Sequence, residues 1–362
     1  MPIIVDTPQA LRALCDRLVQ EPVVAVDTEF LWERTYYPIL GLVQVATADR
    51  SCWLIDTVAL KDLTPFGAVL AAPEVVKILH DAHQDLTILH HATGAFPKRI
   101  FDTRLAAGFA GISSVLSLKS LLITTLDVHL EKSETRSDWT RRPLDPKQVE
   151  YAADDVLYLP ALRDALIEGC FTEETRGWQT EEMAEFDDEE QYREKDPDEA
   201  WLKVKGLHLL RPEQMPVVKA LAAWRERMAR LRDRPRGFII ADPVLVELAI
   251  RQPKSVTTFY EIRKTGSHIP SDEVKEALEL IRKASAEKVE PLPQRHMPYS
   301  RAELKQLEDE LLGKIARRCE ALGVDPALVA SRKDAGHWIL ASEEERERLP
   351  MAKGWRRGIV DG

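Results

Sequence analysis

Two acidic residues stand at the end of a short apolar run near the N-terminus. Residues 23–26 read VVAV and run directly into Asp27, Thr28 and Glu29. Alternate side chains of a β-strand point to the same face, so Asp27 and Glu29 would lie about 7 Å apart there. Two such carboxylates repel each other and lose solvation unless a cation lies between them, and hard oxygen ligands suit Mg²⁺ or Mn²⁺. The alternative is a strand end that emerges into solvent, where acidic side chains are harmless.

A third carboxylate follows the apolar run of residues 75–79. Residues 80–86 read HDAHQDL and open a predicted helix, in which Asp85 has apolar neighbours at positions i−3, i+3 and i+4. Asp85 therefore lies beside the buried stripe, whereas Asp81 is placed to be the helix N-cap. The alternative for Asp85 is an ordinary acid of the first turn, favoured by the helix dipole. As an inward carboxylate it strengthens the metal-site interpretation.

A tyrosine and an aspartate share one face of a predicted helix that begins near Pro146. Tyr151 and Asp155 are four residues apart, which places them on the same side of the helix. Apolar residues surround Asp155 at helical spacing and polar ones surround Asp154, so we expect Asp155 to point inward and Asp154 outward. A tyrosine one turn from a metal-bound aspartate could orient a water molecule. The alternative is that Tyr151 packs on the core with its hydroxyl in solvent.

The elements that would position these residues change in type along the chain. Before the acidic stretch near residue 190, apolar runs rich in β-branched residues alternate with helical patterns, which predicts an α/β domain whose mixed sheet is covered on both faces. Asp102, at the end of one such run, is predicted to be a helix N-cap. After Pro197 apolar residues recur only at helical spacing, and Pro291, Pro293 and Pro298 divide this all-α remainder into two small modules. Strands are predicted near residues 23–26, 40–47, 52–56, 76–80 and 100–102.

The 362 residues carry a formal net charge of −10, which taken alone argues against a nucleic-acid partner. The charge is unevenly distributed, however. Residues 181–199 hold eleven acidic and two basic side chains, a net charge of −9, whereas residues 200–240 hold ten basic and three acidic ones, a net charge of +7. An acidic run is typical of a solvated linker, and the change of sign indicates a domain boundary.

Five arginines of the basic segment fall in the C-terminal half of one predicted helix. They could bind the phosphates of a nucleic acid, and their charge also complements the helix dipole. The alternative is a salt-bridged face that keeps the domain soluble. The five are Arg225, Arg227, Arg230, Arg232 and Arg234.

Composition also bears on the location of the protein. No apolar run approaches the roughly 18 residues that a membrane span needs, and the first twenty residues lack a secretory pattern. The four cysteines are scattered singly, with neither disulfide-framework nor metal-type spacing. A reduced, cytoplasmic protein is therefore expected. The cysteines are Cys15, Cys52, Cys170 and Cys319.

Taken together, the three acidic segments resemble the exonuclease motifs of the DEDD superfamily, in its tyrosine-containing subgroup. The first motif is matched by Asp27-Thr-Glu29, the second by Asp85 and the third by Tyr151-x-x-x-Asp155. Segments outside the motifs are similar to the ribonuclease D family in particular. They are residues 42–45 (LVQV), 101–106 (FDTRLA) and 137–144 (SDWTRRPL).

The C-terminal half carries resemblances of its own. Residues 211–214 (RPEQ), 224–225 (WR) and 235–240 (PRGFII) resemble the helicase-and-RNase-D C-terminal (HRDC) domain. Residues 328–333 (LVASRK) and 354–357 (GWRR) are similar to a second, more divergent copy of that domain. The resemblance implies an α/β exonuclease domain of the ribonuclease H-like fold, followed by two small all-α HRDC-type domains. The implied boundaries are 1–175 for the exonuclease domain, 176–199 for an acidic linker, 200–288 for the first HRDC domain and 289–362 for the second.

The activity that the resemblance implies is metal-dependent 3′→5′ exonucleolytic hydrolysis of RNA, with release of nucleoside 5′-monophosphates. Two divalent ions, Mg²⁺ or Mn²⁺, would activate a water molecule and stabilise the leaving 3′-oxygen. Asp27 would contact both ions, Glu29 and Asp155 would complete one ion site, and Asp85 the other. Tyr151 would hold the attacking water. The implied substrates are tRNA precursors and other small structured RNAs, and the enzyme is expected to act as a monomer.

Substrate contacts are also implied by the resemblance. Gln44, Trp139 and Arg141 match family positions near the nucleotide end, although Trp139 could equally have a core role. Within the basic helix, Arg227 and Arg230 are the predicted RNA ligands.

Two other functions are compatible with parts of the pattern. A DNA 3′→5′ exonuclease would use the same carboxylates, because they do not read the sugar. A non-catalytic nucleic-acid adaptor is a second alternative, against which stands the presence of all four carboxylates and the tyrosine. A helicase is excluded, since no G-x-x-x-x-G-K-[ST] phosphate loop occurs among the sixteen glycines.

Overall fold

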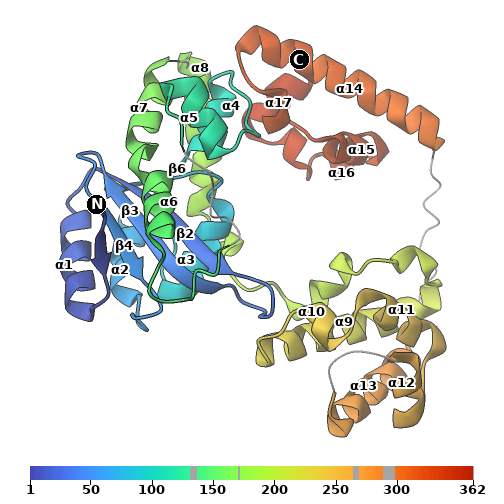
Figure 1. Ribbon diagram of the computed structural model, residues 1–362. Coiled ribbons are helices and arrows are strands. Elements are labelled where there is room, and N and C mark those ends of the chain that lie inside the picture. Colours follow the sequence, from blue (N-terminus) through green and yellow to red (C-terminus); the bar gives the residue numbers. More distant parts are fainter. Residues whose placement is uncertain (131–136, 170–171, 264–268, 288–297, 362) are drawn as a thin grey trace. The chain divides into compact units, whose positions relative to one another are not determined.

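The computed structural model describes residues 1–130, 137–169, 172–263, 269–287 and 298–361. Contacts divide the chain into two units, and Figure 1 labels the elements that make them up. Each unit has its own core of buried apolar side chains. The first unit comprises Met1–Leu31, Leu40–Tyr192 and His296–Gly362, and the second Trp32–Ile39 and Arg193–Arg295. Of the four cysteines, Cys170 lies outside the described residues.

The first unit is built on a six-stranded mixed sheet with the strand order β1-β4-β3-β2-β5-β6. β3 and β4 are antiparallel, whereas the pairs β1–β4, β2–β5 and β5–β6 are parallel. The predicted α/β class with a mixed sheet is confirmed. Strand β1 was not predicted, because a strand of three residues is too short to show an alternating pattern of apolar residues. The strands are β1 (Ile3–Val5), β2 (Val23–Leu31), β3 (Ile39–Thr47), β4 (Cys52–Asp56), β5 (Val76–Leu79) and β6 (Ile100–Asp102).

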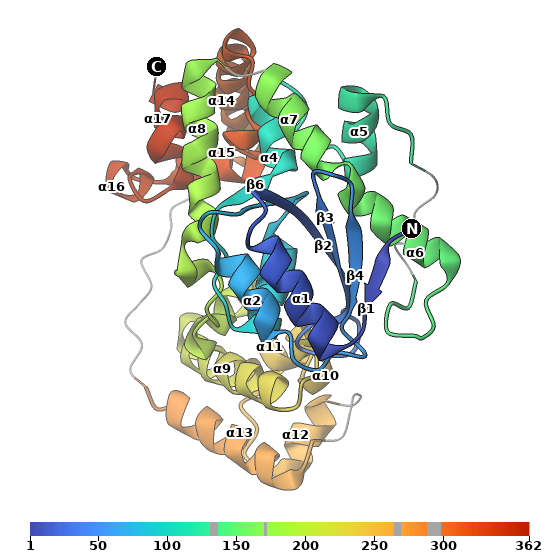
Figure 2. The same cartoon turned by 90° about the vertical axis from the view of Figure 1, so that its left-hand side faces the viewer.

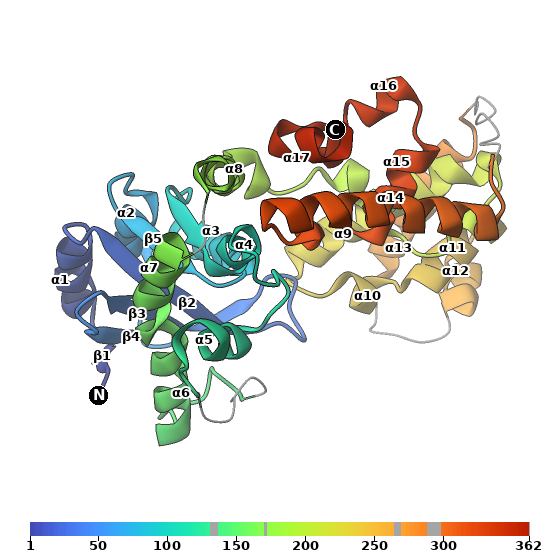
Figure 3. The same ribbon diagram turned by 90° about the horizontal axis from the view of Figure 1, so that it is seen from above.

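Helices cover both faces of this sheet, as Figures 2 and 3 show. One face packs on α1, α2 and α3 through residues such as Val24 and Val26 of β2. The opposite face packs on α4, α5, α6 and α7 through residues such as Ala25 of β2. The helices are α1 (Pro8–Leu18), α2 (Thr64–Ala71), α3 (His83–Thr93), α4 (Thr103–Phe109), α5 (Leu118–Leu126), α6 (Pro146–Leu157), α7 (Leu159–Gly169) and α8 (Glu173–Ala184).

The starts of α3 and α4 depend on one aspartate. Asp102 caps α4 as predicted, because its carboxylate accepts from the backbone N–H groups of Arg104 and Leu105. The prediction that Asp81 caps α3 is wrong: Ala82 is the N-cap residue. The backbone N–H groups of Asp81 and Ala82 donate to Asp102 instead, at 3.2 and 2.8 Å. The side chain of Asp81 is therefore left to pair with Arg104 at 3.2 Å.

The acidic stretch after residue 180 begins inside the first unit. Helix α8 continues into short 3-10 turns, in which Phe186 and Tyr192 are buried in the core that also contains α1 to α3. The Tyr192 hydroxyl donates to the carbonyl of Phe186 at 2.7 Å. These two aromatic residues hold the first part of the acidic stretch, which ends at Tyr192, against the sheet domain.

The C-terminal helices also belong to the first unit and pack on α4 and α8. The rings of Phe109 and Trp355 lie 5.0 Å apart, and the Arg356 guanidinium donates to both carboxylate oxygens of Glu182 at 2.6 and 2.5 Å. The backbone N–H of Ser114 donates to Asp325. The helices are α14 (Arg301–Leu322), α15 (Arg332–Leu340), α16 (Glu343–Arg346) and α17 (Gly354–Asp361).

The second unit is all-helical in its described part, apart from the loop that joins β2 to β3. Its core surrounds α9, whose Val217, Leu221 and Trp224 are fully buried. Tyr36 of the β2–β3 loop, residues 32–38, packs against this core. The helices are α9 (Met215–Leu231), α10 (Arg236–Ile239), α11 (Asp242–Arg251), α12 (Val256–Arg263) and α13 (Ser271–Ala284), preceded by 3-10 segments Pro197–Lys203, Leu207–Leu209 and Pro212–Gln214. None of the helices in the described ranges combines the length and apolar character needed to cross a bilayer.

Candidate metal and active site

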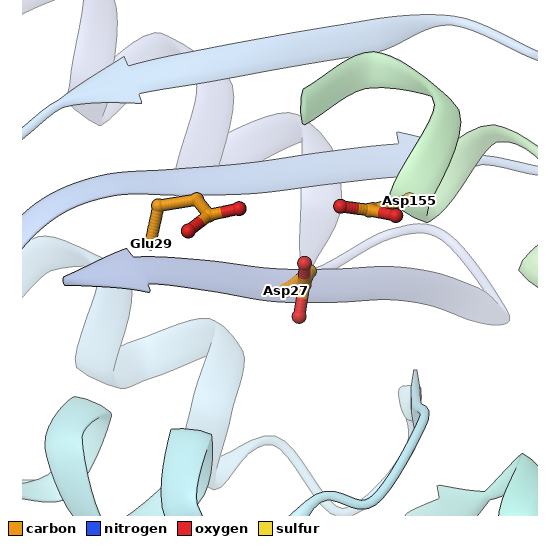
Figure 4. Close-up of side chains that lie close together, drawn as sticks. All are labelled: Asp27, Glu29 and Asp155. Carbon is orange, nitrogen blue, oxygen red and sulfur yellow. The ribbon is translucent and has the colours of Figure 1, made fainter. Parts of the chain in front are cut away.

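Three carboxylates meet on the face of the sheet that α6 covers. One oxygen from each of Asp27, Glu29 and Asp155 lies within 4.8 Å of the other two, and Figure 4 shows the three side chains converging from β2 and α6. The arrangement follows from the strand period: Ala25 packs on this face, so Asp27 and Glu29 two and four residues later point the same way. Carboxylate oxygens so close together form a candidate site for a divalent cation.

Helix α6 supplies the third carboxylate. The apolar stripe of this helix packs against the sheet and so fixes the position of Asp155. Asp145 caps the helix, its capping box is completed by Gln148, and Pro146 occupies the first turn. Ala152 and Val156 are fully buried in the core on this face. Asp155 belongs to the cluster and Asp154 does not. This agrees with the prediction made from the apolar neighbours of Asp155 in the sequence.

The fourth predicted carboxylate, Asp85, lies in the first turn of α3. Its side chain is buried, and the Thr28 hydroxyl, between Asp27 and Glu29 in sequence, donates a hydrogen bond to it. The charge of Asp85 acts on both Asp27 and Glu29. The structure therefore brings all four predicted carboxylates into one electrostatic site.

Burial is the main cause of the raised pKa values of these carboxyl groups, with mutual repulsion second for Asp27 and Glu29. The pKa of Asp27 is raised well above its ordinary value, and that of Glu29 to about 8. The pKa of Asp155 is raised to about 7 and that of Asp85 to about 6, although the bonds from Tyr151 and Thr28 oppose both shifts. A cation bound among the oxygens would relieve this repulsion, so the donor set fits a divalent metal.

Tyr151 lies one helical turn before Asp155 and donates its phenolic hydrogen to that carboxylate. Burial, and then the charges of Asp155 and Glu29, raise the pKa of this phenol well above its ordinary value. Tyr151 is therefore a hydrogen-bond donor and not a base at physiological pH. Such a donor can orient a water molecule or a phosphate oxygen.

Comparison with known proteins agrees with this geometry. Residues 2–168 match the family model of the 3′-5′ exonuclease domain, and residues 214–288 match that of the HRDC domain. The chain is 37% identical to the ribonuclease D of Desulfotalea psychrophila, over 99% of this chain and 96% of the relative. The chain belongs to the ribonuclease D family.

Further relatives of the ribonuclease D family support the assignment over the same length. The Pseudomonas paraeruginosa enzyme is 38% identical over 96% of this chain and 92% of its own. The crystal structure of Escherichia coli RNase D, described as an exoribonuclease involved in structured RNA processing, superposes with a TM-score of 0.82 at 29% identity and covers 100% of this chain and 96% of that one. The second HRDC-like domain over residues 289–362 stays a prediction, because the HRDC model matches residues 214–288.

The three residues that the resemblance to the ribonuclease D family places near the substrate differ from one another in burial. Gln44, on β3, is fully buried, and within the described structure neither its amide nitrogen nor its amide oxygen has a hydrogen-bond partner. Trp139 is also buried, and its ring lies 6.0 Å from that of Tyr151. Arg141 is exposed. Their contact with a nucleotide stays a prediction.

Sequence reasoning missed Arg142, which fixes the segment next to the site. Its guanidinium donates twice to Asp56, at 2.6 Å each, and also to the carbonyls of Gly41 and Trp139 at 2.8 Å each. Asp56 accepts in addition from its own backbone turn, and these bonds lower its pKa despite burial. No local signal points to this pair, because Asp56 and Arg142 are 86 residues apart.

The five arginines predicted to share one helix do not form a single exposed surface. Helix α9 ends at Leu231, so Arg232 and Arg234 lie beyond it. Arg225 is buried, and its guanidinium donates to the Ile240 carbonyl and to Asp242 at 2.9 and 2.7 Å, so this member of the predicted patch cannot reach a phosphate. Arg230 is engaged with Glu226, Glu194 and the carbonyl of Lys195. Arg227 is exposed and lies 3.8 Å from Asp198. RNA binding by Arg227 and Arg230 stays a prediction.

Proposed function

We propose that this chain is a metal-dependent 3′→5′ exoribonuclease that shortens the 3′ ends of tRNA precursors and other small structured RNAs. The observation that carries the proposal is the carboxylate cluster of Asp27, Glu29 and Asp155, with Asp85 and Tyr151 beside it. Membership of the ribonuclease D family supports exonuclease chemistry. The choice of RNA is supported by the relation to the Escherichia coli enzyme, which processes structured RNA.

The residues of the site have distinct roles in this proposal. Two divalent ions, Mg²⁺ or Mn²⁺, would supply an activated water molecule and charge stabilisation at the leaving 3′-oxygen. Asp27 interacts electrostatically with each of the other three carboxylates and would serve both ions. Glu29 and Asp155 would hold one ion, and Asp85 the other. Tyr151 keeps its proton and would orient the attacking water through its hydroxyl. The products would be nucleoside 5′-monophosphates.

The setting of the enzyme is part of the same proposal. Cys15, Cys52 and Cys319 are buried free thiols, and burial raises their pKa values, so they are chemically inert. Unpaired cysteines suit the reducing cytoplasm, where we place the enzyme. We further propose that it acts as a monomer, since a single chain supplies all five motif residues.

The test is a 3′-extended tRNA precursor incubated with the full-length protein and Mg²⁺, and read at single-nucleotide resolution. Stepwise 3′ shortening that stops when a chelator is added would support the proposal. A DNA strand of matched sequence, run in parallel, tests the choice of nucleic acid. Internal cuts, an absence of products, or faster degradation of the DNA would contradict the proposal.

A further inference from the structure

A cavity lined mainly by arginines lies in the second unit. It has a volume of about 440 Å³, within the range of small-molecule sites. We call it the arginine pocket and define it by its lining residues: Arg34, Arg232, Arg234, Phe238 and Ile239. Arg34 comes from the β2–β3 loop, and the other four residues come from the turn after α9 and from α10.

The backbone around the arginine pocket is held by hydrogen bonds between the β2–β3 loop and the turn after α9. Asp233 lies in the left-handed region with φ of 45°, and its carboxylate accepts from the backbone N–H groups of Tyr36 and Tyr37 at 2.9 and 3.0 Å. The Tyr36 hydroxyl donates to Glu226 and accepts from Arg236 at 3.2 Å. This network holds the backbone of the loop next to the turn, so the two segments that carry Arg34 and Arg234 are kept side by side.

The charge of the arginine pocket is strongly positive. Arg34 and Arg234 are exposed, and no carboxylate of a described residue lies within 4.0 Å of either guanidinium. Arg234 donates to the carbonyl of Arg34, at 3.4 Å. Arg232 is paired with Glu273, which neutralises one of the three charges. Two guanidinium groups thus remain available, and their planar forked donors match the oxygens of a phosphate.

The pocket also presents an aromatic surface. The side chain of Phe238 lines the cavity and is 46% exposed, whereas the neighbouring Ile239 is 3% exposed. A half-exposed phenyl ring next to arginines without a carboxylate partner suits a ligand with both a phosphate and a flat base. Single-stranded nucleic acid has these two parts at each nucleotide, whereas an acidic peptide offers carboxylates without a base.

We propose that the arginine pocket binds a single-stranded segment of RNA, with a phosphate held by Arg34 and Arg234 and a base stacked on Phe238. The inference rests on the proposed function for the choice of RNA. It gives the helical unit a defined RNA-binding site, and it assigns the contact to residues on the loop and the turn. This site differs from the face of α9 that the sequence suggested.

The test is equilibrium binding of a 5′-fluorescein-labelled, unstructured single-stranded RNA to the full-length protein in a chelator, so that the RNA stays intact. The double variant Arg34→Gln/Arg234→Gln should weaken binding about tenfold or more. The slope of log K against log salt should become shallower by about 0.7, because the variant neutralises one phosphate fewer. The matched control is Arg251→Gln, an exposed arginine of α11 in the same unit, which should bind as the wild type does.

Variants of Phe238 provide a second test of the inference. Phe238→Leu should weaken binding about tenfold, because base stacking requires an aromatic ring, and Phe238→Tyr should retain affinity. All variants change exposed side chains, and circular dichroism checks their folding. Equal loss in Arg251→Gln, no loss in the double variant, or displacement of the RNA by polyglutamate at equal charge concentration would overturn the inference.

The same preparations separate the inference from the proposed function. With Mg²⁺ in place of the chelator, the wild-type protein should shorten the RNA, and the double variant should show a KM about tenfold higher. If the wild type shortens the RNA and the double variant has an unchanged KM and affinity, the inference that the arginine pocket binds RNA is contradicted and the proposed function is supported. If the wild type binds RNA through the pocket but leaves it intact, the proposed function fails and the pocket stands.

Discussion

The Tyr151 hydroxyl donates a hydrogen bond to the Asp155 carboxylate one helical turn later, within a cluster of raised-pKa carboxyl groups. The bond favours the ionised form of Asp155 and opposes the effect of burial on its pKa. Because burial, and then the charges around it, keep the phenol protonated, Tyr151 can be a donor to water or phosphate but not a general base.

Removing the Tyr151 hydroxyl should therefore slow the reaction without emptying the site. We expect Tyr151→Phe to lower kcat about 10- to 100-fold, since the variant cannot form this positioning hydrogen bond. Mg²⁺ binding, measured by isothermal titration calorimetry, should stay within about threefold of wild type, because no carboxylate has been changed. A wild-type kcat would show that the phenol has no part in the reaction.

Gly41 sets the distance between β3 and the segment that carries Trp139. A Cβ atom at Gly41 would lie 2.6 Å from the Trp139 carbonyl oxygen, so Gly41→Ala must displace the tryptophan whose ring neighbours Tyr151. We expect a loss of about 1–3 kcal/mol in the free energy of unfolding, measured with urea, together with a lower kcat.

The matched control for Gly41→Ala is Gly177→Ala in α8. No atom lies within 4 Å of a Cβ placed there, and the residue is helical. Alanine should stabilise the protein by up to about 1 kcal/mol. If the two variants behaved alike, the close approach at Gly41 would not be the cause of the loss in stability.

The raised carboxyl pKa values predict how the metal-free protein responds to pH. Glu29 and Asp155 titrate at about 8 and 7 in the folded protein, so between roughly pH 4 and pH 8 the folded state binds more protons than the unfolded state. This contribution to stability is fully present below the unfolded pKa values and is lost as pH rises through the folded ones. Urea unfolding in a chelator should therefore show decreasing stability from about pH 5 to about pH 7.

A neutral side chain at position 29 checks the origin of that slope. Glu29→Gln removes one of the raised groups, so it should make the decrease shallower, and added Mg²⁺ should reduce the decrease in the wild type. A slope that Glu29→Gln and Mg²⁺ both leave unchanged would place the titrating groups elsewhere.

Lys77 on β5 gives an opposite pH dependence. Its side chain is fully buried and donates to the Ala72 carbonyl at 2.6 Å, and burial lowers its pKa to about 7. Between pH 7 and pH 10.5 the unfolded lysine binds a proton that the folded one lacks, so this group makes stability rise with pH.

Replacing Lys77 by methionine should keep the packing and remove the buried charge. We expect Lys77→Met to stabilise the protein by about 2 kcal/mol at about pH 6, and by less at about pH 9, where Lys77 is already neutral. The measurement is urea unfolding at the two pH values. Destabilisation at both would mean that the bond to Ala72 matters more than the cost of burying the ammonium group.

Features with a local cause could be predicted from the sequence. The strand period placed Asp27 and Glu29 on one face, and the apolar neighbours of Asp155 distinguished it from Asp154. Asp102 caps α4 because a cap depends on residues two and three positions away.

Features that depend on distant parts of the chain could not be predicted. Asp81 has no capping role because Asp102, from another strand, bonds the same N–H groups. Arg142 finds Asp56 across 86 residues, and Arg225 is buried with an ion pair to Asp242. The grouping of the β2–β3 loop with the helical unit likewise depends on Asp233 and Tyr36, which are 197 residues apart.

The most direct test of the carboxylate site compares two adjacent aspartates. Asp155→Asn and Asp154→Asn each remove one negative charge from the same turn of α6, but only Asp155 belongs to the cluster. On a 3′-extended RNA with Mg²⁺, read at single-nucleotide resolution, Asp155→Asn should lower the rate of stepwise shortening by at least about 100-fold, while Asp154→Asn should retain the wild-type rate. Wild-type shortening by Asp155→Asn, or equal loss in both variants, would contradict the proposed metal site.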